Sequence, residues 1–453
     1  MSQDNEHPSS PSSRVVDRKK PKIFYGWYIV LAAAAINVYG AGVWFYGFPI
    51  FYKVLIDEFG WARATGALVV SLSRVEGGLE APIVGWFVDK FGPRAMAVIG
   101  AIIFGIGYLL MSLVSDFSVG PIQISALVVF ILLYAGIMSI GYNTGFSHAS
   151  MAAVNGWFIK KRSRAFAIFS LGAGASGITV FVLGLAMQNF GWRSAAIMAG
   201  IGIFIFVVPM SLLLRHKPEE YGYLPDGEDP NRVVDSNDIQ LEDVNNANSI
   251  STDTPNYDYS VKEALATYAF WMLLLGSAAR SLTMTSVVVH EVAYLTDIGI
   301  PISQASAALG GMVFASLIGR FGFGILGDYI DKRYLLIATY MLQAVGIFVL
   351  DSVQNMNQVW TFVVIYGIAY GGAIPLYFAI VGDYFGRTNY ATIRGFQQFF
   401  MIPAVVFGPI YAGLVFDVSG DYSFAFMSFI GTLIVGMVFV FLARNPLSKQ
   451  ANI

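Results

Sequence analysis

Residues 309–333 read LGGMVFASLIGRFGFGILGDYIDKR, an apolar run that ends in a charged turn. The run begins near Ala307 and is long enough to cross a bilayer as a helix. Arg320 lies inside it, eight residues before Asp328, which places the arginine roughly 12 Å from the charged end of a helix. A charged side chain at that depth is costly unless it faces protein, water or an anion. Arg320 therefore indicates a substrate or ion pathway.

The charged turn occurs twice in the chain. Its glycine, aspartate and arginine have the same spacing in GWFVDKFGPR and GILGDYIDKR, at Gly85, Asp89, Arg94 and at Gly324, Asp328, Arg333. Two apolar segments that end in the same turn indicate two related halves. We interpret the motif residues as a lock between helix ends that holds one conformation and opens in another. The alternative is that they are simple topogenic charges.

The composition is typical of a membrane protein. Of 453 residues, 56% are hydrophobic and 12% are charged, against about 45–50% and about 25% in soluble domains. A net charge of −2 argues against nucleic-acid binding, and the lack of cysteine excludes disulfides and thiol chemistry. No catalytic, nucleotide-binding or metal-ligand spacing is present. We therefore expect no enzyme activity, no cofactor and no metal site.

Twelve apolar runs of about 20 residues are each long enough to cross ~30 Å of hydrocarbon. We expect an all-α membrane protein in which twelve transmembrane helices form two pseudo-symmetric six-helix bundles. The predicted spans are 25–50, 63–87, 95–115, 121–150, 164–188, 192–214, 264–294, 302–326, 333–352, 358–383, 391–416 and 422–443.

The polar segments divide this chain into regions. We expect a disordered cytoplasmic tail at 1–22, an N-terminal six-helix bundle at 23–214, an acidic linker at 215–262, a C-terminal six-helix bundle at 263–444 and a tail at 445–453. The linker and the tails have too few apolar residues to pack a core. The first residues also lack the apolar core and cleavage site of a signal peptide.

Lysine and arginine gather in alternate loops. They are frequent in 14–22, 90–94, 160–164, 332–333 and 387–394, whereas the intervening loops contain almost none. Because basic loops stay in the cytoplasm, we expect both termini and the linker to be cytoplasmic and the protein to lie in the cell membrane.

The two-half layout and the repeated turn resemble the major facilitator superfamily over essentially the whole chain. Finer patterns are similar to its monocarboxylate transporter and oxalate/formate antiporter group. They are YGWYIV at 25–30, FPIFYKVLIDEFGWAR at 48–63, GWFIKKRSRAFAIFSLGAGASG at 156–177, DYFGRTNYATIRG at 383–395 and GPIYAGLVFDVSGDYSFAF at 408–426. The resemblance implies that the chain carries small organic anions, above all monocarboxylates, by alternating access with proton symport or anion exchange.

The resemblance also implies roles for single residues. Arg320 matches the helix 8 arginine that binds the substrate carboxylate in this group, and Lys53 matches a lysine that attracts anions. In one departure, animal members have an aspartate four residues before the arginine, where this chain has Ser316. Their aspartate–arginine scheme for proton coupling therefore does not transfer.

Arginine suits a carboxylate ligand because its planar guanidinium donates two parallel hydrogen bonds and stays charged. We interpret Arg320 and Arg280 as substrate ligands. The alternatives are a structural ion pair or a snorkelling side chain for Arg320, and an ion pair with Glu76 or Glu80 for Arg280. Lys53 has the alternative of an ordinary headgroup lysine. Tyr39, Asn143 and Tyr370 are further candidates for the cavity wall, with helix packing as the alternative.

Helix 2 carries unusual charge. Glu76 and Glu80 lie four residues apart and so share one face of a helix, whereas Arg74 lies on the other side. A carboxylate in a dry environment can hold a proton, so we assign proton coupling to these residues together with His290. The alternative is a charge network that braces helix 2, and for His290 an ordinary interfacial role.

Two other functions stay open. The first is a transporter-like receptor or sensor in which the acidic linker docks a partner. The second is a carrier of a different small solute, such as a cation, although arginines in the cavity would repel it. The partners we expect are an organic anion, protons or a counter-anion, and the lipid bilayer, without nucleic acid.

Overall fold

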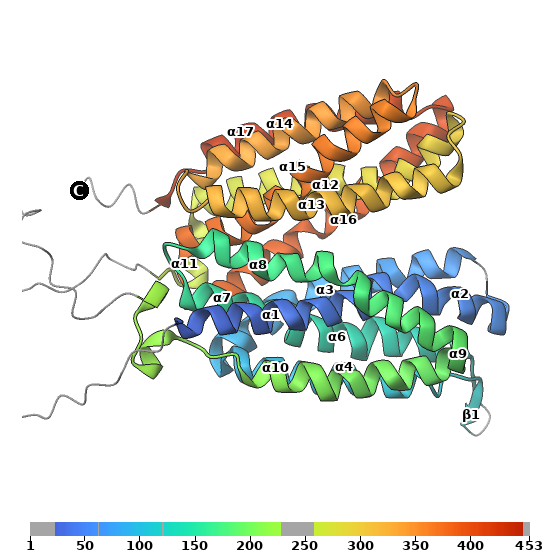
Figure 1. The fold of residues 1–453 in the computed structure, drawn as a ribbon, viewed down its shortest axis with the longest axis horizontal. Helices are drawn as coiled ribbons and strands as arrows, with labels where there is room; N and C mark the ends of the chain where they lie inside the picture. Colours follow the sequence, from blue (N-terminus) through green and yellow to red (C-terminus); the bar gives the residue numbers. More distant parts are fainter. Residues whose placement is uncertain (1–22, 62, 120–121, 228–257, 447–453) are drawn as a thin grey trace, which may run out of the picture.

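The computed structural model describes residues 23–61, 63–119, 122–227 and 258–446. The middle of the predicted linker and most of both predicted tails lie outside these residues. Within them the chain is mostly helical, and its two halves form two bundles that lie side by side (Figure 1). The prediction of a helical membrane protein is confirmed.

The first half contains the helices from α1 to α10. They are α1 (Tyr25–Ala41), η1 (Gly42–Tyr46), α2 (Phe48–Phe59), α3 (Arg63–Phe91), α4 (Pro93–Met111), α5 (Ala126–Ile131), η2 (Leu132–Met138), α6 (Ser139–Tyr142), η3 (Asn143–His148), α7 (Ala149–Trp157), α8 (Arg162–Ala175), α9 (Gly177–Gly202), η4 (Ile203–Val207) and α10 (Val208–Leu212). A short antiparallel hairpin, β1 (Phe117–Val119) and β2 (Ile122–Ile124), follows α4. It is a small departure from the all-α prediction.

The second half begins after two short turns and contains six long helices. The turns are η5 (Pro218–Tyr221) and η6 (Pro225–Gly227), and the helices of this half are α11 (Val261–Ala266), α12 (Tyr268–Asp297), α13 (Ile302–Leu326), α14 (Lys332–Asp351), α15 (Met356–Phe385), α16 (Tyr390–Ser419) and α17 (Ser423–Leu442). Local sequence sets their ends. The side chain of Asn355, for example, accepts from the N–H of Gln358 at the start of α15.

Ten helical stretches of the described residues are long and apolar enough to cross a membrane. One of them, Arg162–Leu212, contains a break at Gly191, where φ is 78° and the chain turns. Helix α3 has 29 residues but is not among the ten, because Arg74, Glu76 and Glu80 add charge to it. The count of twelve crossings stays a prediction.

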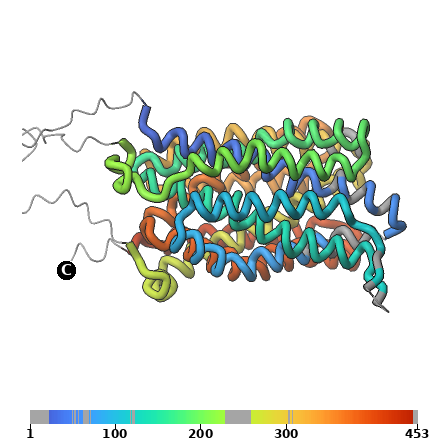
Figure 2. Tube along the Cα trace, turned by 90° about the horizontal axis from the view of Figure 1, so that it is seen from below, coloured from blue at the N-terminus to red at the C-terminus, as the bar shows by residue number. Residues whose placement is uncertain are grey.

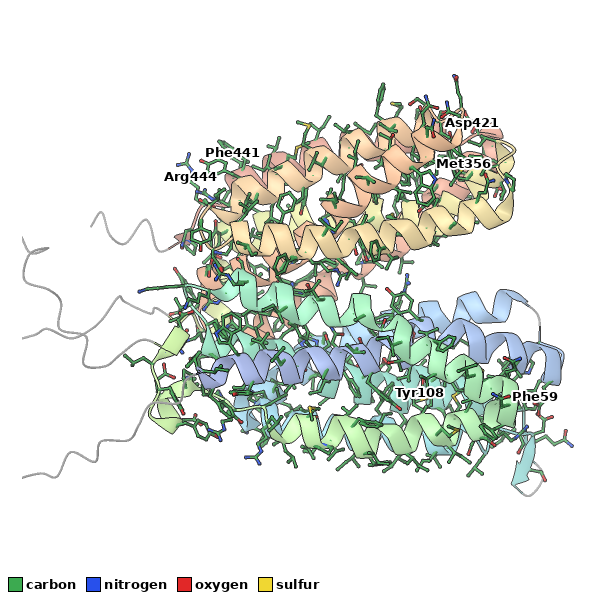
Figure 3. All side chains as sticks on the ribbon, in the orientation of Figure 1. Phe59, Tyr108, Met356, Asp421, Phe441 and Arg444 are labelled. Carbon is green, nitrogen blue, oxygen red and sulfur yellow. The ribbon has the colours of Figure 1, made fainter. Side chains whose placement is uncertain are left out.

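Helix α1 begins and helix α17 ends on the same side of the bundle pair, which we call the tail side. The start of α1 and helix α11 lie there (Figures 1 and 2), and Arg444 marks this side in Figure 3. Phe59 and Asp421 mark the opposite end (Figure 3).

The halves touch through small residues. Helix α3 packs on α16, and α8 packs on α13 and α15. A Cβ at Gly85 would meet the backbone of Ala391, and a Cβ at Gly324 would meet Ala167. The glycine of each motif copy therefore allows a helix of one half to approach a helix of the other half closely.

Candidate functional site

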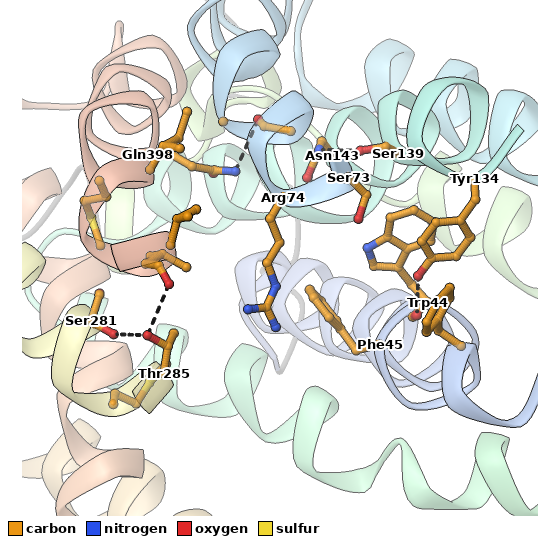
Figure 4. Close-up of a pocket in the computed structure, with 18 of the residues that line it drawn as sticks. Trp44, Phe45, Ser73, Arg74, Tyr134, Ser139, Asn143, Ser281, Thr285 and Gln398 are labelled. Carbon is orange, nitrogen blue, oxygen red and sulfur yellow. Dashed lines mark hydrogen bonds between the residues drawn. The ribbon is translucent and has the colours of Figure 1, made fainter. Parts of the chain in front are cut away.

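A cavity of about 400 Å³ lies between the two halves (Figure 4). Its N-terminal wall comes from η1, α2, α3, η2, α6 and η3, and its C-terminal wall comes from α12 and α16. It is the site that the two-bundle arrangement offers for a ligand, because both halves contribute residues to it.

Aromatic rings form much of the N-terminal wall. Trp44 stacks on Tyr134 with ring centroids 4.2 Å apart, and the hydroxyl of Tyr134 donates to the carbonyl of Trp44 over 3.2 Å. Phe48 packs on Tyr134 at 4.6 Å. Phe45 is 53% exposed and lines the cavity. The wall is therefore rigid and largely apolar.

Arg74 projects into the cavity from α3 (Figure 4). Among the described residues its guanidinium makes no hydrogen bond and no ion pair. Tyr134 is its electrostatic neighbour. A cation that lines a cavity without a protein partner is available to an anionic ligand.

Most other polar side chains of the wall already have protein partners. The Asn143 amide donates to Glu80 over 2.7 Å. The Thr285 hydroxyl donates to the Ser281 carbonyl over 2.8 Å. The Gln398 amide donates to the Gly77 carbonyl. Arg394 donates to the Gln397 side chain, and its guanidinium lies over the Tyr377 ring. Of the two arginines in the wall, Arg394 has a hydrogen bond to Gln397, whereas Arg74 has none among the described residues.

Arg280 and Arg320 lie beside this cavity and do not line it. Arg280 donates from Nη2 to the Tyr370 carbonyl over 2.8 Å. Arg320, 5% exposed, donates from Nη1 to the Ser170 carbonyl of α8 over 2.5 Å. Tyr46, 41% exposed, is within electrostatic range of Arg320 and Tyr370.

Neither of these arginines has a carboxylate partner among the described residues. The alternative of an ion pair between Arg280 and a helix 2 glutamate is therefore not found. The Nε atoms of Arg280 and Arg320 are buried without hydrogen-bond partners. In each arginine at least this Nε–H donor is left for a ligand after a rearrangement.

The two glutamates of α3 lie behind the cavity wall. Glu80 accepts from the Asn143 amide over 2.7 Å, and Glu76 lies one helical turn earlier on the same face of α3. Two neighbouring carboxyl groups disfavour a second negative charge, so one of them can hold a proton. One further oxygen, Oε2 of Glu76, is buried without a partner. This pair can hold a proton next to the ligand cavity.

Two other predicted site residues lie elsewhere, and the side chain of a third is outside the described residues. The Tyr39 hydroxyl donates to the Ala199 carbonyl of α9 over 2.8 Å, so it lies in the packing between α1 and α9. His290 is bonded through both ring nitrogens, to the Tyr422 hydroxyl and the Pro409 carbonyl. The backbone of Lys53 belongs to α2, but its side chain lies outside the described residues.

The aspartates of the repeated motif connect the two halves on the tail side. Asp89 at the end of α3 accepts from the backbone N–H of Ala391 and Thr392, over 3.1 and 2.8 Å, and from the Thr392 hydroxyl. Asp328 after α13 accepts from the N–H of Arg164 and pairs with its Nε at 3.3 Å. Each aspartate thus caps the first turn of a helix in the other half.

Burial raises the pKa of Asp328, and the bond and charge of Arg164 oppose this shift. The motif arginines do not join these contacts. Arg94 is exposed and makes no hydrogen bond or ion pair within the described part of the chain. Arg333 pairs with Asp331, two residues away, at 2.7 Å. Their gating role stays a prediction.

Ion pairs that we did not predict reinforce the tail side. Arg162, 2% exposed, pairs with Asp383 at 2.5 Å, and Lys332 pairs with the same carboxylate at 2.7 Å. Arg387 pairs with Glu219 at 2.7 Å. Further hydrogen bonds between the halves join Arg320 to Ser170 and Gln398 to Gly77. Together with the ion pairs they close the cavity toward the tail side.

The sequence-family model of the Major Facilitator Superfamily matches residues 30–287 and 269–452 of this chain. The chain belongs to this superfamily. Its members are transporters, not enzymes, so the expectation of no enzyme activity is confirmed by the family. The resemblance stated from the sequence is confirmed as well.

Relatives within the superfamily are distant. Monocarboxylate transporter 2 of Mus musculus is 22% identical over 93% of this chain and 84% of its own length. The MFS-type transporter pynF of Aspergillus niger is 22% identical over 88% of this chain and 82% of its own length. A crystal structure of the superfamily transporter FucP in the outward conformation superposes with a TM-score of 0.65 at 12% identity, over 92% of this chain and 99% of FucP. That likeness shows the fold.

Several residues of this superfamily member were missed from the sequence. Arg394 lies near the start of the apolar run 391–416, and an arginine at that place was the available signal. Arg162 stands in the basic loop KKRSR, where it looked like one topogenic charge among several. Trp44 and Phe45 had no signal, because aromatic residues occur in all spans.

Proposed function

We propose that the chain is a secondary transporter of small organic anions, monocarboxylates above all. One observation carries this proposal: four arginines lie in or beside the cavity between the halves, and none of them pairs with a carboxylate among the described residues. They are Arg74, Arg280, Arg320 and Arg394.

Uncompensated cations inside a membrane are costly, and the cost falls when an anion binds. The guanidinium fork matches a carboxylate through two charge-assisted hydrogen bonds. A cationic solute would add to the repulsion. The arrangement therefore favours an organic anion over a cation.

Arg320 is the proposed carboxylate ligand of the rearranged state. It holds Ser170 of the other half while the tail side is closed. Alternating access separates the halves on this side and breaks that bond. The freed guanidinium can then bind the carboxylate, with Arg280 and Tyr370 beside it. Lys53 stays a candidate for attracting anions.

The Glu76–Glu80 pair is the proposed proton site. The pair lies behind Asn143 and Ser139, which line the cavity. Symport with one proton would make the transport of a monocarboxylate electroneutral, whereas exchange of two anions needs no titrating group. The placement of a proton-holding pair beside the cavity favours symport.

The loop charges support an orientation with the tail side in the cytoplasm of a cell membrane. The closed tail side would then be the cytoplasmic gate. The start of the predicted linker is attached to the first half, because the Asp226 carboxylate accepts from the backbone N–H groups of Ile159, Lys160 and Lys161. This contact favours a structural role for this end of the linker.

Uptake into proteoliposomes tests the proposal. Purified protein is reconstituted, and the entry of labelled mono- and dicarboxylates and of an organic cation is measured with and without an inward proton gradient. We expect carboxylate uptake that the gradient accelerates, and no cation uptake. Specific binding without uptake of any carboxylate would favour the sensor, and uptake of the cation alone would refute the proposal.

A further inference from the structure

We propose, on the basis of the anion transport argued above, that Glu291 is a second proton-binding site, which lies inside the C-terminal half and controls the affinity of Arg280 for anions. A proton on Glu291 leaves the charge of Arg280 available to the anion, and loss of this proton weakens anion binding. The site is separate from the Glu76–Glu80 pair, because that pair belongs to α3 of the N-terminal half and Glu291 belongs to α12.

Glu291 is a fully buried carboxyl group without a partner. Its exposed fraction is 0%, and both of its oxygens are buried without a hydrogen bond within the described part of the chain. An ionised carboxylate in such surroundings loses its hydration and gains no protein contact in return, which is far more costly than burial of the neutral acid. Glu291 therefore holds a proton in this conformation.

A second unpartnered polar group lies within electrostatic range of Glu291. The Tyr366 hydroxyl of α15 is buried without a hydrogen-bond partner, and the electrostatic neighbours of Tyr366 are Glu291, Arg280 and Tyr370. A Cβ at Gly346 of α14 would meet the Tyr366 side chain at 2.9 Å, so the glycine lets α14 pack closely on this tyrosine. The hydroxyl can therefore donate to Glu291 once the carboxyl group has lost its proton.

Glu291 and Arg280 share one face of α12. They are eleven residues apart, which is close to three turns of a helix and a rise of about 16 Å. Thr283 and Val287 lie between them on this face, and both are 0% exposed. Tyr366 of α15 neighbours both charged groups. A negative charge on Glu291 should therefore act on Arg280, because a dry interior screens charges weakly.

Arg280 transmits this effect to the region of the proposed anion ligands. It donates to the Tyr370 carbonyl over 2.8 Å, and Tyr370 and Arg320 are both electrostatic neighbours of Tyr46 in the first half. An ionised Glu291 offsets part of the Arg280 charge and repels an anion bound there, whereas a protonated Glu291 does neither. By linkage, a bound anion also strengthens proton binding at Glu291.

The other titratable groups of α12 near Glu291 have different surroundings. His290 uses both ring nitrogens, on a tyrosine hydroxyl and a backbone carbonyl. The Tyr294 hydroxyl donates to two backbone carbonyls at the end of α14, where the Asp351 carboxyl group is its electrostatic neighbour. Asp297, at the end of α12, is exposed. None of these groups forms a hydrogen bond with the Glu291 carboxyl group.

The helices that pack on α12 add few titratable groups near Glu291. Helix α17 contains none, and α13 contains only Arg320, toward the tail side. Helix α11 packs on the start of α12, also on the tail side. In α16, the half away from the tail side carries Tyr411 and the exposed Asp417. Among the described residues, Tyr366 is therefore the titratable side chain through which Glu291 and Arg280 are linked.

Equilibrium binding at different pH tests the inference. Labelled formate, pyruvate and benzoate are bound to the purified full-length protein from about pH 5.5 to about pH 8, where these anions stay ionised and a buried carboxyl group can titrate. The series is run in wild type and in a protein with Glu76→Gln and Glu80→Gln, in which the pair on α3 does not titrate. We expect affinity in both proteins to fall about fivefold as the pH rises, because an ionised Glu291 offsets the charge of Arg280.

Four variants locate the proton. Glu291→Gln resembles the protonated side chain and should keep the low-pH affinity over the whole range. Tyr366→Phe keeps the ring but removes the hydroxyl, so the pH effect should shrink. Asp297→Asn makes the same change from acid to amide at an exposed position of α12, and it should retain the full fivefold change. His290→Gln should retain it as well.

Infrared difference spectroscopy observes the proton without any ligand. The stretching band of a protonated carboxyl group should disappear from wild type between the two ends of the pH range, and Glu291→Gln should lack this part of the change. If Glu291→Gln folds poorly, Tyr366→Phe still tests the link to Arg280, because its buried ring is retained. A spectrum of Glu291→Gln that changes with pH as wild type does would show that Glu291 does not titrate and would overturn the inference.

The binding outcomes separate this inference from the proposed function. Anion binding with the same pH dependence in Glu291→Gln as in wild type would overturn the inference and leave the proposed function intact. Loss of the pH dependence in His290→Gln alone would assign the proton to the histidine and would overturn it too. Absence of binding by all three anions at every pH would refute the proposed function and, with it, the link to Arg280.

Discussion

The interface between the two halves has two regions with opposite electrostatics. On the tail side, buried charges have partners across the interface, as Arg162 has with Asp383 and Arg164 has with Asp328. In the cavity, Arg74 has no partner among the described residues. The paired charges stabilise the conformation in which the tail side is closed, whereas the unpaired charge of Arg74 can bind an anionic ligand. Substitutions in the first region should change the conformational equilibrium, and those in the second should change binding.

The largest effect is expected at Asp383. Asp383→Asn leaves the 2% exposed Arg162 without its carboxylate, and breaking a buried pair costs about 3–5 kcal/mol. The closed tail side should therefore open. The chain has no cysteine, so Ser163→Cys, at a fully buried position on the tail side, reports the opening by its rate of thiol labelling.

We expect labelling of Ser163→Cys to accelerate at least tenfold in the Asp383→Asn background. Asp417→Asn, which removes an exposed carboxylate near the far end of α16, is the control and should leave the rate unchanged. An unchanged rate in Asp383→Asn would show that the ion pair does not hold the tail side closed.

Arg320 lies at the border of the two regions, and its substitution decides to which it belongs. As a carboxylate ligand it would supply charge-assisted hydrogen bonds of roughly 1.5–3 kcal/mol, which corresponds to about 10- to 150-fold in affinity. Arg320→Ala should show this loss in direct binding, and Arg320→Lys should recover part of it. Wild-type affinity together with faster labelling of Ser163→Cys would assign Arg320 to the tail-side contacts alone.

A smaller effect is expected at the two motif aspartates. Asp89→Asn keeps one acceptor oxygen for the start of α16, so the loss should be that of a weakened helix cap, about 0.5–2 kcal/mol. Asp328→Asn loses the pairing with Arg164 as well and should open the tail side more. Both rates are read from Ser163→Cys labelling, and a larger effect of Asp89→Asn would contradict this order.

The sequence predicted the fold far better than the site. The repeated turn and the apolar runs are local signals, and the structure confirms a helical membrane protein of this superfamily. The close approach of Gly85 and Gly324 to the other half is also the reason that glycine stands in both copies of the turn. Such patterns are visible because they repeat.

The site depends on which side chains come into contact from segments far apart in the sequence. Arg320 was expected in a cavity and is bonded to Ser170, 150 residues away, while Arg74, assigned to proton coupling, has the available guanidinium in the cavity. Depth along one helix can be read from spacing, but the partner of a side chain depends on the packing of other helices. The roles of both arginines stay predictions.

The smallest effect on affinity, with a clear effect on coupling, is expected at the glutamates of α3. Glu80→Gln keeps an acceptor for Asn143 but removes the titrating carboxyl group beside Glu76. Since neither carboxyl is a ligand of the carried anion, affinity should change by about 1 kcal/mol or less. Uptake driven by a proton gradient should be lost, because the carrier could no longer exchange the proton, whereas exchange of labelled for unlabelled substrate needs no net proton movement and should persist.

Glu76→Gln should behave in the same way, and Glu263→Gln, on the tail side outside the bundles, is the control. If uptake keeps its dependence on the proton gradient in both variants, the pair only braces α3 against α6 and η3, and the proton crosses elsewhere.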